Sequence, residues 1–145
     1  MKLIIFDIDG TIINSVNTDD ECFIQTFNDL YQIDLANTKW ADFNNVTDGG
    51  LTTEIFEKWL NQMPSEKEIE TIKTHFYGLL KQREMEFTEI EGALSFIKQL
   101  SEFQVFQIGF ATGGWKETAE LKCAAIGFDI SEYIFKSSNL SLIHI

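Results

Sequence analysis

The sequence of 145 residues has few basic side chains for its size. Lysine and arginine together number 11 against 23 aspartates and glutamates, which gives a formal net charge of −12. Proteins that bind nucleic acids gain affinity from Lys and Arg side chains that neutralise phosphates. The acidic balance therefore argues against a nucleic-acid partner, although it leaves room for a small phosphate in a local pocket.

Cysteines and long apolar runs are also scarce. Cys22 and Cys123 lie far apart without a CxxC partner, so we expect two buried thiols in a reducing compartment. The first apolar run is cut by Asp7 and is too short for a secretory signal. No run approaches the ~18 apolar residues of a membrane span. These absences predict a soluble, cytoplasmic protein without a membrane partner.

The residues that are present predict an α/β fold. Residues 3–8 and 104–111 are apolar runs typical of buried strands, and residues 132–135 are a weaker third candidate. Helical spacing of apolar residues predicts three helices between the first two strands and one helix before the second strand. A fifth helix is predicted over about 116–126, with Gly127 as its stop. We expect a Rossmann-like parallel sheet in a three-layer α/β/α arrangement.

The long segment between the first two strands predicts an inserted subdomain. A parallel crossover needs only about a dozen residues, whereas this segment carries three predicted helices, one of them opened by a capping box of Ser65 and Glu68. We expect residues 1–13 and 89–139 to form the α/β core. Residues 14–88 are expected to form a helical cap over the carboxyl ends of the strands.

The last six residues, 140–145, can be encoded by the end sequence of a transposon adapter used for sequencing libraries. We therefore expect this tail to be foreign to the fold. We also expect the natural protein to continue past Asn139.

Polar residues follow both main strands. Asp7 and Asp9 end the first, and ligands in open α/β sheets bind beyond the carboxyl ends of strands. The pair could hold Mg2+, could divide nucleophile and acid/base roles, or could be a solvated strand end. After the second strand, Thr112 and Gly113 precede a helix start, an arrangement that favours an anion.

The sequence resembles the haloacid dehalogenase superfamily of phosphohydrolases, of the kind with a class-one cap and similar to phosphoglycolate phosphatase. Residues 7–11, DIDGT, match the first motif of that family, and Thr112–Gly113 match the second. The resemblance implies Asp7 as nucleophile, Asp9 as acid and base, and Mg2+ on the Asp7 carboxylate and the Asp9 carbonyl. The phosphoryl oxygens would be held by Gly10, Thr11, Thr112 and Gly113.

The resemblance also limits the reaction class. Dehalogenase members lack the second acid, and ion-pumping members carry Thr there, so Asp9 leaves a phosphatase acting on a small phosphorylated metabolite or a sugar phosphomutase. A phospho-accepting module without enzymatic activity and an inactive binding module are further alternatives. In the cap, Thr47 and Asp48 are the candidate substrate residues.

Two motifs of the family are not found in the sequence. The third supplies a basic residue, but Lys122 and Lys136 are expected to be solvated charges on a helix or loop. The fourth supplies further acids for the metal. If both lie beyond Asn139, the chain as written should be nearly inactive.

Overall fold

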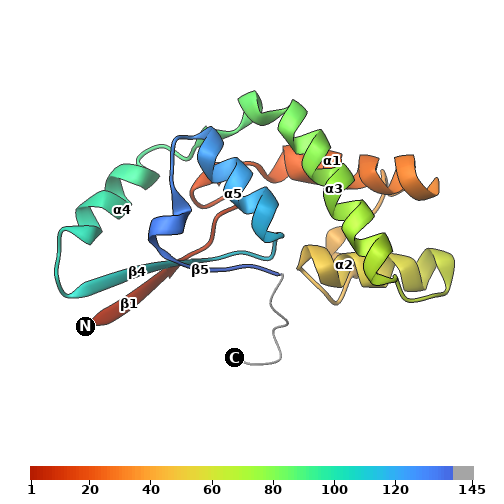
Figure 1. The fold of residues 1–145 in the computed structure, drawn as a ribbon, viewed down its shortest axis with the longest axis horizontal. Helices are drawn as coiled ribbons and strands as arrows, with labels where there is room; N and C mark the ends of the chain where they lie inside the picture. The colour runs from red at the N-terminus through yellow and green to blue at the C-terminus, as the bar shows by residue number, and fades with distance from the viewer. Residues whose placement is uncertain (139–145) are drawn as a thin grey trace.

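The computed structural model describes residues 1–138, and its centre is a parallel sheet (Figure 1). β1 (Lys2–Phe6) pairs with β4 (Phe106–Ala111), which pairs with β5 (Ile134–Lys136), so the strand order is β1-β4-β5. The predicted α/β class and parallel sheet are confirmed. β1 ends two residues earlier than predicted, because the chain turns there and the amides of Thr11 and Ile12 donate to the Ile8 carbonyl.

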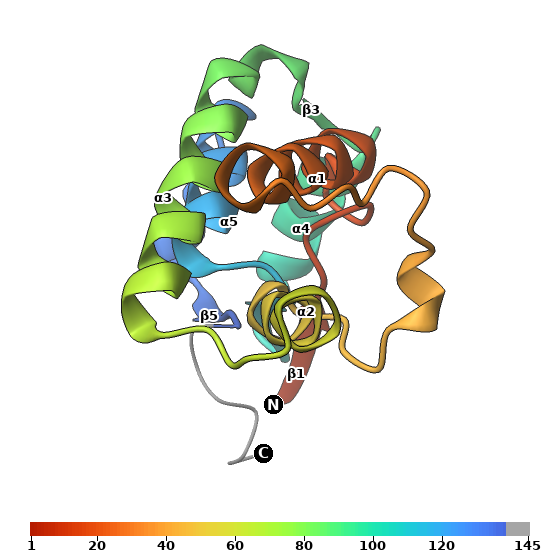
Figure 2. The same cartoon turned by 90° about the vertical axis from the view of Figure 1, so that its right-hand side faces the viewer.

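Two helices pack on the same side of this sheet (Figures 1 and 2). They are α4 (Ala93–Ser101) and α5 (Lys116–Ala125), each placed between successive strands. The ring of Phe6 contacts Phe96 of α4 and Phe110 of β4, with ring centroids 6.3 and 6.0 Å apart. Phe110 is buried and Phe6 is half-buried, so these ring contacts help to hold α4 on the sheet.

The predicted helical insertion is present and lies beyond the carboxyl ends of β1 and β4 (Figure 1). It starts and finishes in a short antiparallel pair, β2 (Ile13–Asn14) with β3 (Thr88–Glu89). Its helices are α1 (Val16–Tyr31), α2 (Asp48–Ile55) and α3 (Glu66–Gln82), with short helical turns at Trp40–Asp42, Phe56–Leu60 and Glu84–Glu86. The predicted capping box forms, because Ser65 accepts from the Glu68 amide while Glu68 accepts from the Ser65 amide.

An aromatic cluster joins the insertion to the sheet side of the molecule. The ring of Phe23 on α1 contacts Phe76 on α3 at 5.5 Å between centroids, and both contact Trp115 just before α5, at 6.3 and 6.0 Å. All three side chains are buried. The cluster thus sets the position of the insertion over the strand ends.

A further short turn, Ile130–Glu132, leads into β5. Among residues 1–138, no helix is both long enough and apolar enough to cross a lipid bilayer.

Candidate active site

Asp7 and Asp9 both line one cavity of about 450 Å³ beyond the end of β1. Asp7 is exposed, whereas the side chain of Asp9 is only 23% exposed. β1 has already ended at Phe6, so the two carboxylates are brought together by the turn after the strand rather than by strand alternation. The turn after β1 therefore accounts for the position of both acids at one site.

The Asp9 carboxylate is held by three side chains. Its Oδ1 accepts from Ser15 Oγ at 2.7 Å and from Lys122 Nζ at 2.5 Å, and its Oδ2 accepts from Thr112 Oγ1 at 3.2 Å. Burial alone would raise the pKa of Asp9, but the charge of Lys122 and the hydrogen bonds from Lys122 and Ser15 lower it below its usual value. Asp9 is therefore a fixed, ionised carboxylate in this arrangement.

The prediction that Lys122 is a solvated charge is wrong. Its side chain is 2% exposed, and its Nζ also lies 2.6 Å from Asp19 Oδ2. An ammonium is buried at this cost only when carboxylates surround it, and the two carboxylates hold the pKa of Lys122 above its usual value despite burial. Lys122 therefore places a cation beside Asp9 within the part of the chain that the structure describes, whereas the expectation of a further basic residue beyond Asn139 stays a prediction.

Sequence reasoning missed Asp19, which lies in the first turn of α1. Burial raises the pKa of Asp19 to about 8, even though the Lys122 ammonium opposes the shift. A signal for Lys122 existed: it follows buried Thr118 and Ala119 by four and three residues, on the inner side of α5. A comparable signal marked Asp19, because buried residues follow it by three and four positions on the inner side of α1. The pairing of Asp19 with Lys122, 103 residues away, had no such signal.

The loop after β4 carries Thr112 and Gly113 into the same cavity, as predicted. The Thr112 hydroxyl contacts Asp9 and accepts from the Gly114 amide at 3.0 Å. A side chain at Gly113 would place its Cβ 2.9 Å from the Val46 carbonyl oxygen. Glycine is needed here because a loop of the insertion approaches the backbone closely.

Asp48 lies against this loop. Its amide donates to the Gly113 carbonyl at 2.9 Å, and its Oδ2 accepts from the Trp115 amide at 3.0 Å. Burial raises the pKa of Asp48 to about 6. Asp48 lines the cavity, as expected of a residue that contacts the substrate. Its carboxylate, however, joins the insertion to the loop after β4.

Three other predicted site residues, Thr47, Gly10 and Thr11, make hydrogen bonds with backbone groups in this structure. The Thr47 hydroxyl accepts from the Gly50 amide as the N-cap of α2. Gly10 has a positive φ of 76°, and its amide donates to the Ile13 carbonyl, while the Thr11 amide donates to the Ile8 carbonyl. None of the three is among the residues that line the cavity.

The carboxylate of Asp7 suits a hard divalent cation, because the charge of the cation would favour the ionised form of this group. Partial burial of the Asp7 carboxyl and the charge of Asp9 raise the pKa of Asp7, although the Ile8 amide opposes the shift. A divalent cation bound to the carboxylate would instead lower the pKa of Asp7. Residues 1–138 contain no cluster of three or more His, Cys, Asp and Glu that could hold a metal. Mg2+ needs few protein ligands, because it keeps several waters and binds phosphate oxygens.

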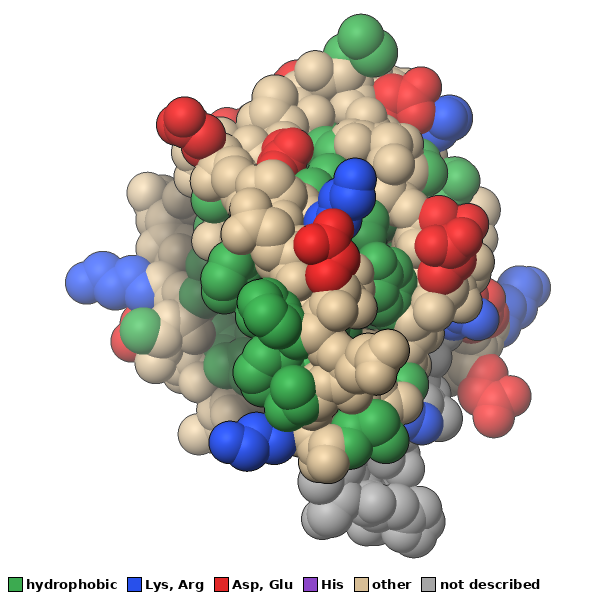
Figure 3. Space-filling view, turned by 90° about the vertical axis from the view of Figure 1, so that its left-hand side faces the viewer, with side chains coloured by type: hydrophobic (Ala, Val, Ile, Leu, Met, Phe, Trp, Pro, Cys, Tyr) green, Lys and Arg blue, Asp and Glu red, His purple; other side chains and the backbone are tan. Residues whose placement is uncertain are grey.

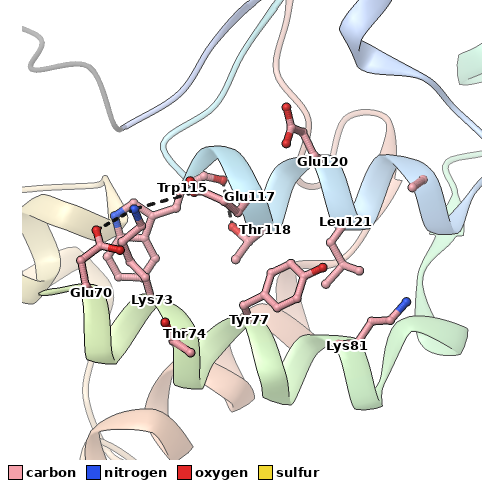
Figure 4. A pocket seen from close by; sticks show the side chains of 11 residues that line it. Glu70, Lys73, Thr74, Tyr77, Lys81, Trp115, Glu117, Thr118, Glu120 and Leu121 are labelled. Atoms are coloured by element: carbon pink, nitrogen blue, oxygen red, sulfur yellow. Dashed lines mark hydrogen bonds and ion pairs between the residues drawn. The ribbon is translucent and has the colours of Figure 1, made fainter.

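A larger hollow of about 610 Å³ lies between α3 and α5, away from the acid pair (Figure 4). Figure 4 shows Lys73 beside Glu70 and Glu117, with N–O distances of 3.1 and 3.8 Å, and Tyr77 facing Leu121. Lys73 thus pairs with Glu117 across the groove and with Glu70 on its own helix. We place the candidate site in the smaller cavity, where the acids and Lys122 meet.

The fold and this arrangement of acids, Thr and Lys at the strand ends define a Rossmann-like α/β protein with its site under a helical insertion. The family model of haloacid dehalogenase-like hydrolases matches residues 4–139. The chain therefore belongs to the haloacid dehalogenase-like hydrolases, which confirms the resemblance of the sequence. No protein with curated annotation matches it.

Solved structures agree in fold. A hydrolase from Pseudomonas syringae is 20% identical with a TM-score of 0.74, over 95% of this chain and 61% of that one. CbbY from Rhodobacter sphaeroides, in complex with phosphate, is 18% identical with a TM-score of 0.72, over 98% and 65%. A predicted phosphoglycolate phosphatase from Haemophilus somnus is 17% identical with a TM-score of 0.67, over 100% and 65%. The chain thus spans less than two thirds of the length of these structures.

Proposed function

We propose that the protein is a Mg2+-dependent phosphoric monoester hydrolase that acts through an aspartyl phosphate on Asp7. The observation that supports this proposal is that the two acids have different surroundings. Asp7 is exposed to the cavity, whereas Asp9 is fixed by Ser15, Thr112 and Lys122. A nucleophile must reach the substrate, and an acid/base group must be held in place beside it.

In the first step, a carboxylate oxygen of Asp7 bonds to phosphorus as the bond to the leaving oxygen breaks. The leaving oxygen takes a proton from Asp9. In the second step, Asp9 takes a proton from water, whose oxygen attacks phosphorus and releases phosphate from Asp7. The lowered pKa of Asp9 suits the second step. For the first step Asp9 must gain a proton, which requires a looser contact with Lys122.

The Asp7 carboxylate and the Asp9 backbone carbonyl would hold Mg2+, which would offset negative charge between Asp7 and the phosphate. A structure of the HAD-hydrolase YfnB from Bacillus subtilis bound to magnesium shares the fold, with a TM-score of 0.56. Thr112 and Gly113 would bind phosphoryl oxygens. Lys122 would stabilise the charge that passes between the phosphate and Asp9.

We further propose that residues 1–13 and 89–139 act as the core and residues 14–88 as the cap, which the pairing of β2 with β3 at the ends of the insertion supports. The substrate would be a small phosphorylated metabolite. CbbY has been crystallised with phosphate and with xylulose-(1,5)-bisphosphate. The two buried thiols agree with a cytoplasmic location.

A sugar phosphomutase is the second candidate, because the bonds of Asp48 to Gly113 and Trp115 close the insertion over the loop after β4. Such closure keeps water from an aspartyl phosphate. A mutase would return the phosphoryl group to the sugar, so it would release little inorganic phosphate.

The test is release of inorganic phosphate from a panel of phosphate monoesters, with Mg2+ and with EDTA. Asp7→Asn should abolish turnover, and Asp9→Asn should slow it by about 10²–10⁴-fold. Asp42→Asn, at an exposed acid outside the cavity, is the control. Equal turnover by the Asp7→Asn protein would overturn the mechanism. Sugar phosphate isomerisation without phosphate release would favour the mutase.

A further inference from the structure

The charges around the cavity restrict what can be attached to the phosphate. We propose that the leaving group of the substrate is uncharged or cationic and carries no second anionic group. This inference rests on the proposed function and specifies its substrate class. It follows from the groups that line the cavity beyond the two catalytic acids.

The first argument is the balance of charge. Five carboxylates line the cavity, those of Asp7, Asp9, Asp19, Asp20 and Asp48. Among the described residues of its wall there is a single basic side chain, Lys122. Its ammonium already contacts Asp9 and Asp19 and is 2% exposed. A carboxylate or second phosphate on the substrate would therefore find acids around it and, among residues 1–138, no basic side chain free to pair with it.

The second argument is the ionisation of Asp20 and Asp48, two of the acids that the insertion contributes to the wall. The side chain of Trp40 donates a hydrogen bond to Asp20, which opposes the effect of burial on the pKa of that carboxyl. Asp48 accepts from the Trp115 amide. Each contact favours the ionised form against burial, which still raises the pKa of both carboxyls, that of Asp48 to about 6. An anion brought beside an ionised carboxylate in this partly buried site would be repelled. An ammonium or a hydroxyl group would be received by the same carboxylates.

The third argument is the apolar part of the wall. Phe23, Leu51 and Phe76 line the cavity together with Trp40. These side chains can cover the carbon skeleton of a small leaving group but offer no partner to an anion. Among its described residues, the wall thus combines apolar contacts with hydrogen-bond acceptors.

The experiment compares three phosphates with the same two-carbon skeleton: phosphoethanolamine, hydroxyethyl phosphate and phosphoglycolate. Binding to the full chain carrying Asp7→Asn is measured by calorimetry at one fixed concentration of free Mg2+, so that chelation by phosphoglycolate does not deplete the metal. We expect phosphoglycolate to bind at least about 10-fold more weakly than the other two. In the unmodified chain, kcat/KM should follow the same order.

Asp20→Asn removes one carboxylate from the wall and should reduce this discrimination. Asp42→Asn makes the same change of charge outside the cavity and should leave it unchanged. Tighter or equal binding of phosphoglycolate, or no binding of any of the three, would overturn the inference. Failure of the unmodified chain to hydrolyse any of them, with the expected order of binding, would instead count against the proposed function alone.

Discussion

Lys122 is the residue whose surroundings matter most to the site. It is buried with two carboxylates, and its removal leaves Asp9 and Asp19 without their common cation. Breaking a buried ion pair by removing one partner costs about 3–5 kcal/mol. The residue thus affects both the stability of the protein and the ionisation of Asp9.

We expect Lys122→Met to lower the free energy of unfolding by about 3–5 kcal/mol, measured by urea denaturation at pH 7. Lys116→Met is the control on the same helix, because Lys116 is 56% exposed and its ion pair with Glu120 lies at the surface. Exposed pairs contribute about 0–1 kcal/mol. Equal losses in the two variants would show that the buried contacts of Lys122 are not formed in solution.

Asp48 should make stability depend on pH. Its pKa is about 6 in the folded protein and about 4 in an unfolded chain. The folded state therefore holds the proton more tightly, and the contribution of Asp48 to stability is present below pH ~4 and lost as the pH rises through about 6. Asn at this position keeps an oxygen acceptor for the Trp115 amide and does not titrate.

We therefore expect the stability difference between Asp48→Asn and the unmodified chain to shift in favour of the variant between pH 4 and 6. Denaturant midpoints measured across this range test the prediction. A difference that does not change with pH would mean that Asp48 is not buried against the loop after β4.

At the level of elements, the 45–48 loop of the insertion lies against the 112–115 loop at the strand ends. Gly113 permits it, because a Cβ there would lie 2.9 Å from the Val46 carbonyl oxygen. Gly78 lies in α3, where a Cβ would meet nothing within 4 Å. A methyl group at position 113 would therefore clash with the backbone of the insertion, whereas one at position 78 would meet no other atom within 4 Å.

We expect Gly113→Ala to separate the two loops, which should lower the melting temperature and weaken phosphate binding in calorimetry. Gly78→Ala should stabilise the protein by up to about 1 kcal/mol, because Gly is unfavourable inside a helix. If Gly113→Ala binds phosphate as well as the unmodified chain does, the close approach of the loops does not shape the site.

The elements themselves could largely be predicted from the sequence, because apolar spacing and caps are local signals. Ser65 and Glu68 marked the start of α3, and the runs around Ile4 and Ile108 marked two strands. The DIDGT segment predicted that Asp7 and Asp9 lie together at the end of the first strand. What could not be predicted was the partner of each polar group, since Lys122 meets Asp9 and Asp19 only after the chain has folded.

The same limit applies to Thr47 and Asp48. The position of both in a polar, glycine-rich segment made them candidates for substrate contact. Only the structure assigns the Thr47 hydroxyl to the cap of α2 and the Asp48 carboxylate to the Trp115 amide. Ordinary helix caps and site residues have the same composition, so composition alone does not separate them.

For the whole molecule, one face of the sheet exposes apolar side chains and carries no helix formed by residues 1–138. Leu3, Ile5 and Ile134 are 52, 60 and 45% exposed, and β1 is an outer strand in the order of the sheet formed by the described residues. Figure 3 shows hydrophobic side chains gathered at the end of the molecule where β1, β4 and α4 lie. Exposed apolar strands at the edge of a sheet favour association between chains.

We expect the chain to self-associate as its concentration rises, and we expect Ile5→Lys to reduce this association in sedimentation velocity experiments. Met85→Lys is the control, because Met85 is 91% exposed in the Glu84–Glu86 turn, away from the sheet. If both variants sediment as the unmodified chain does at every concentration, the exposed part of β1 does not mediate contacts between chains.

The two buried cysteines give the protein internal reporters of its own opening. Cys22 lies on α1 of the insertion and Cys123 on α5 beside the sheet, and both are fully buried. Burial raises the pKa of both thiols, that of Cys123 to about 12, so almost no thiolate is available at neutral pH. Each thiol can react with a disulfide reagent only when its own helix moves away, and the two exchange rates would time separately the opening of the insertion and of the sheet.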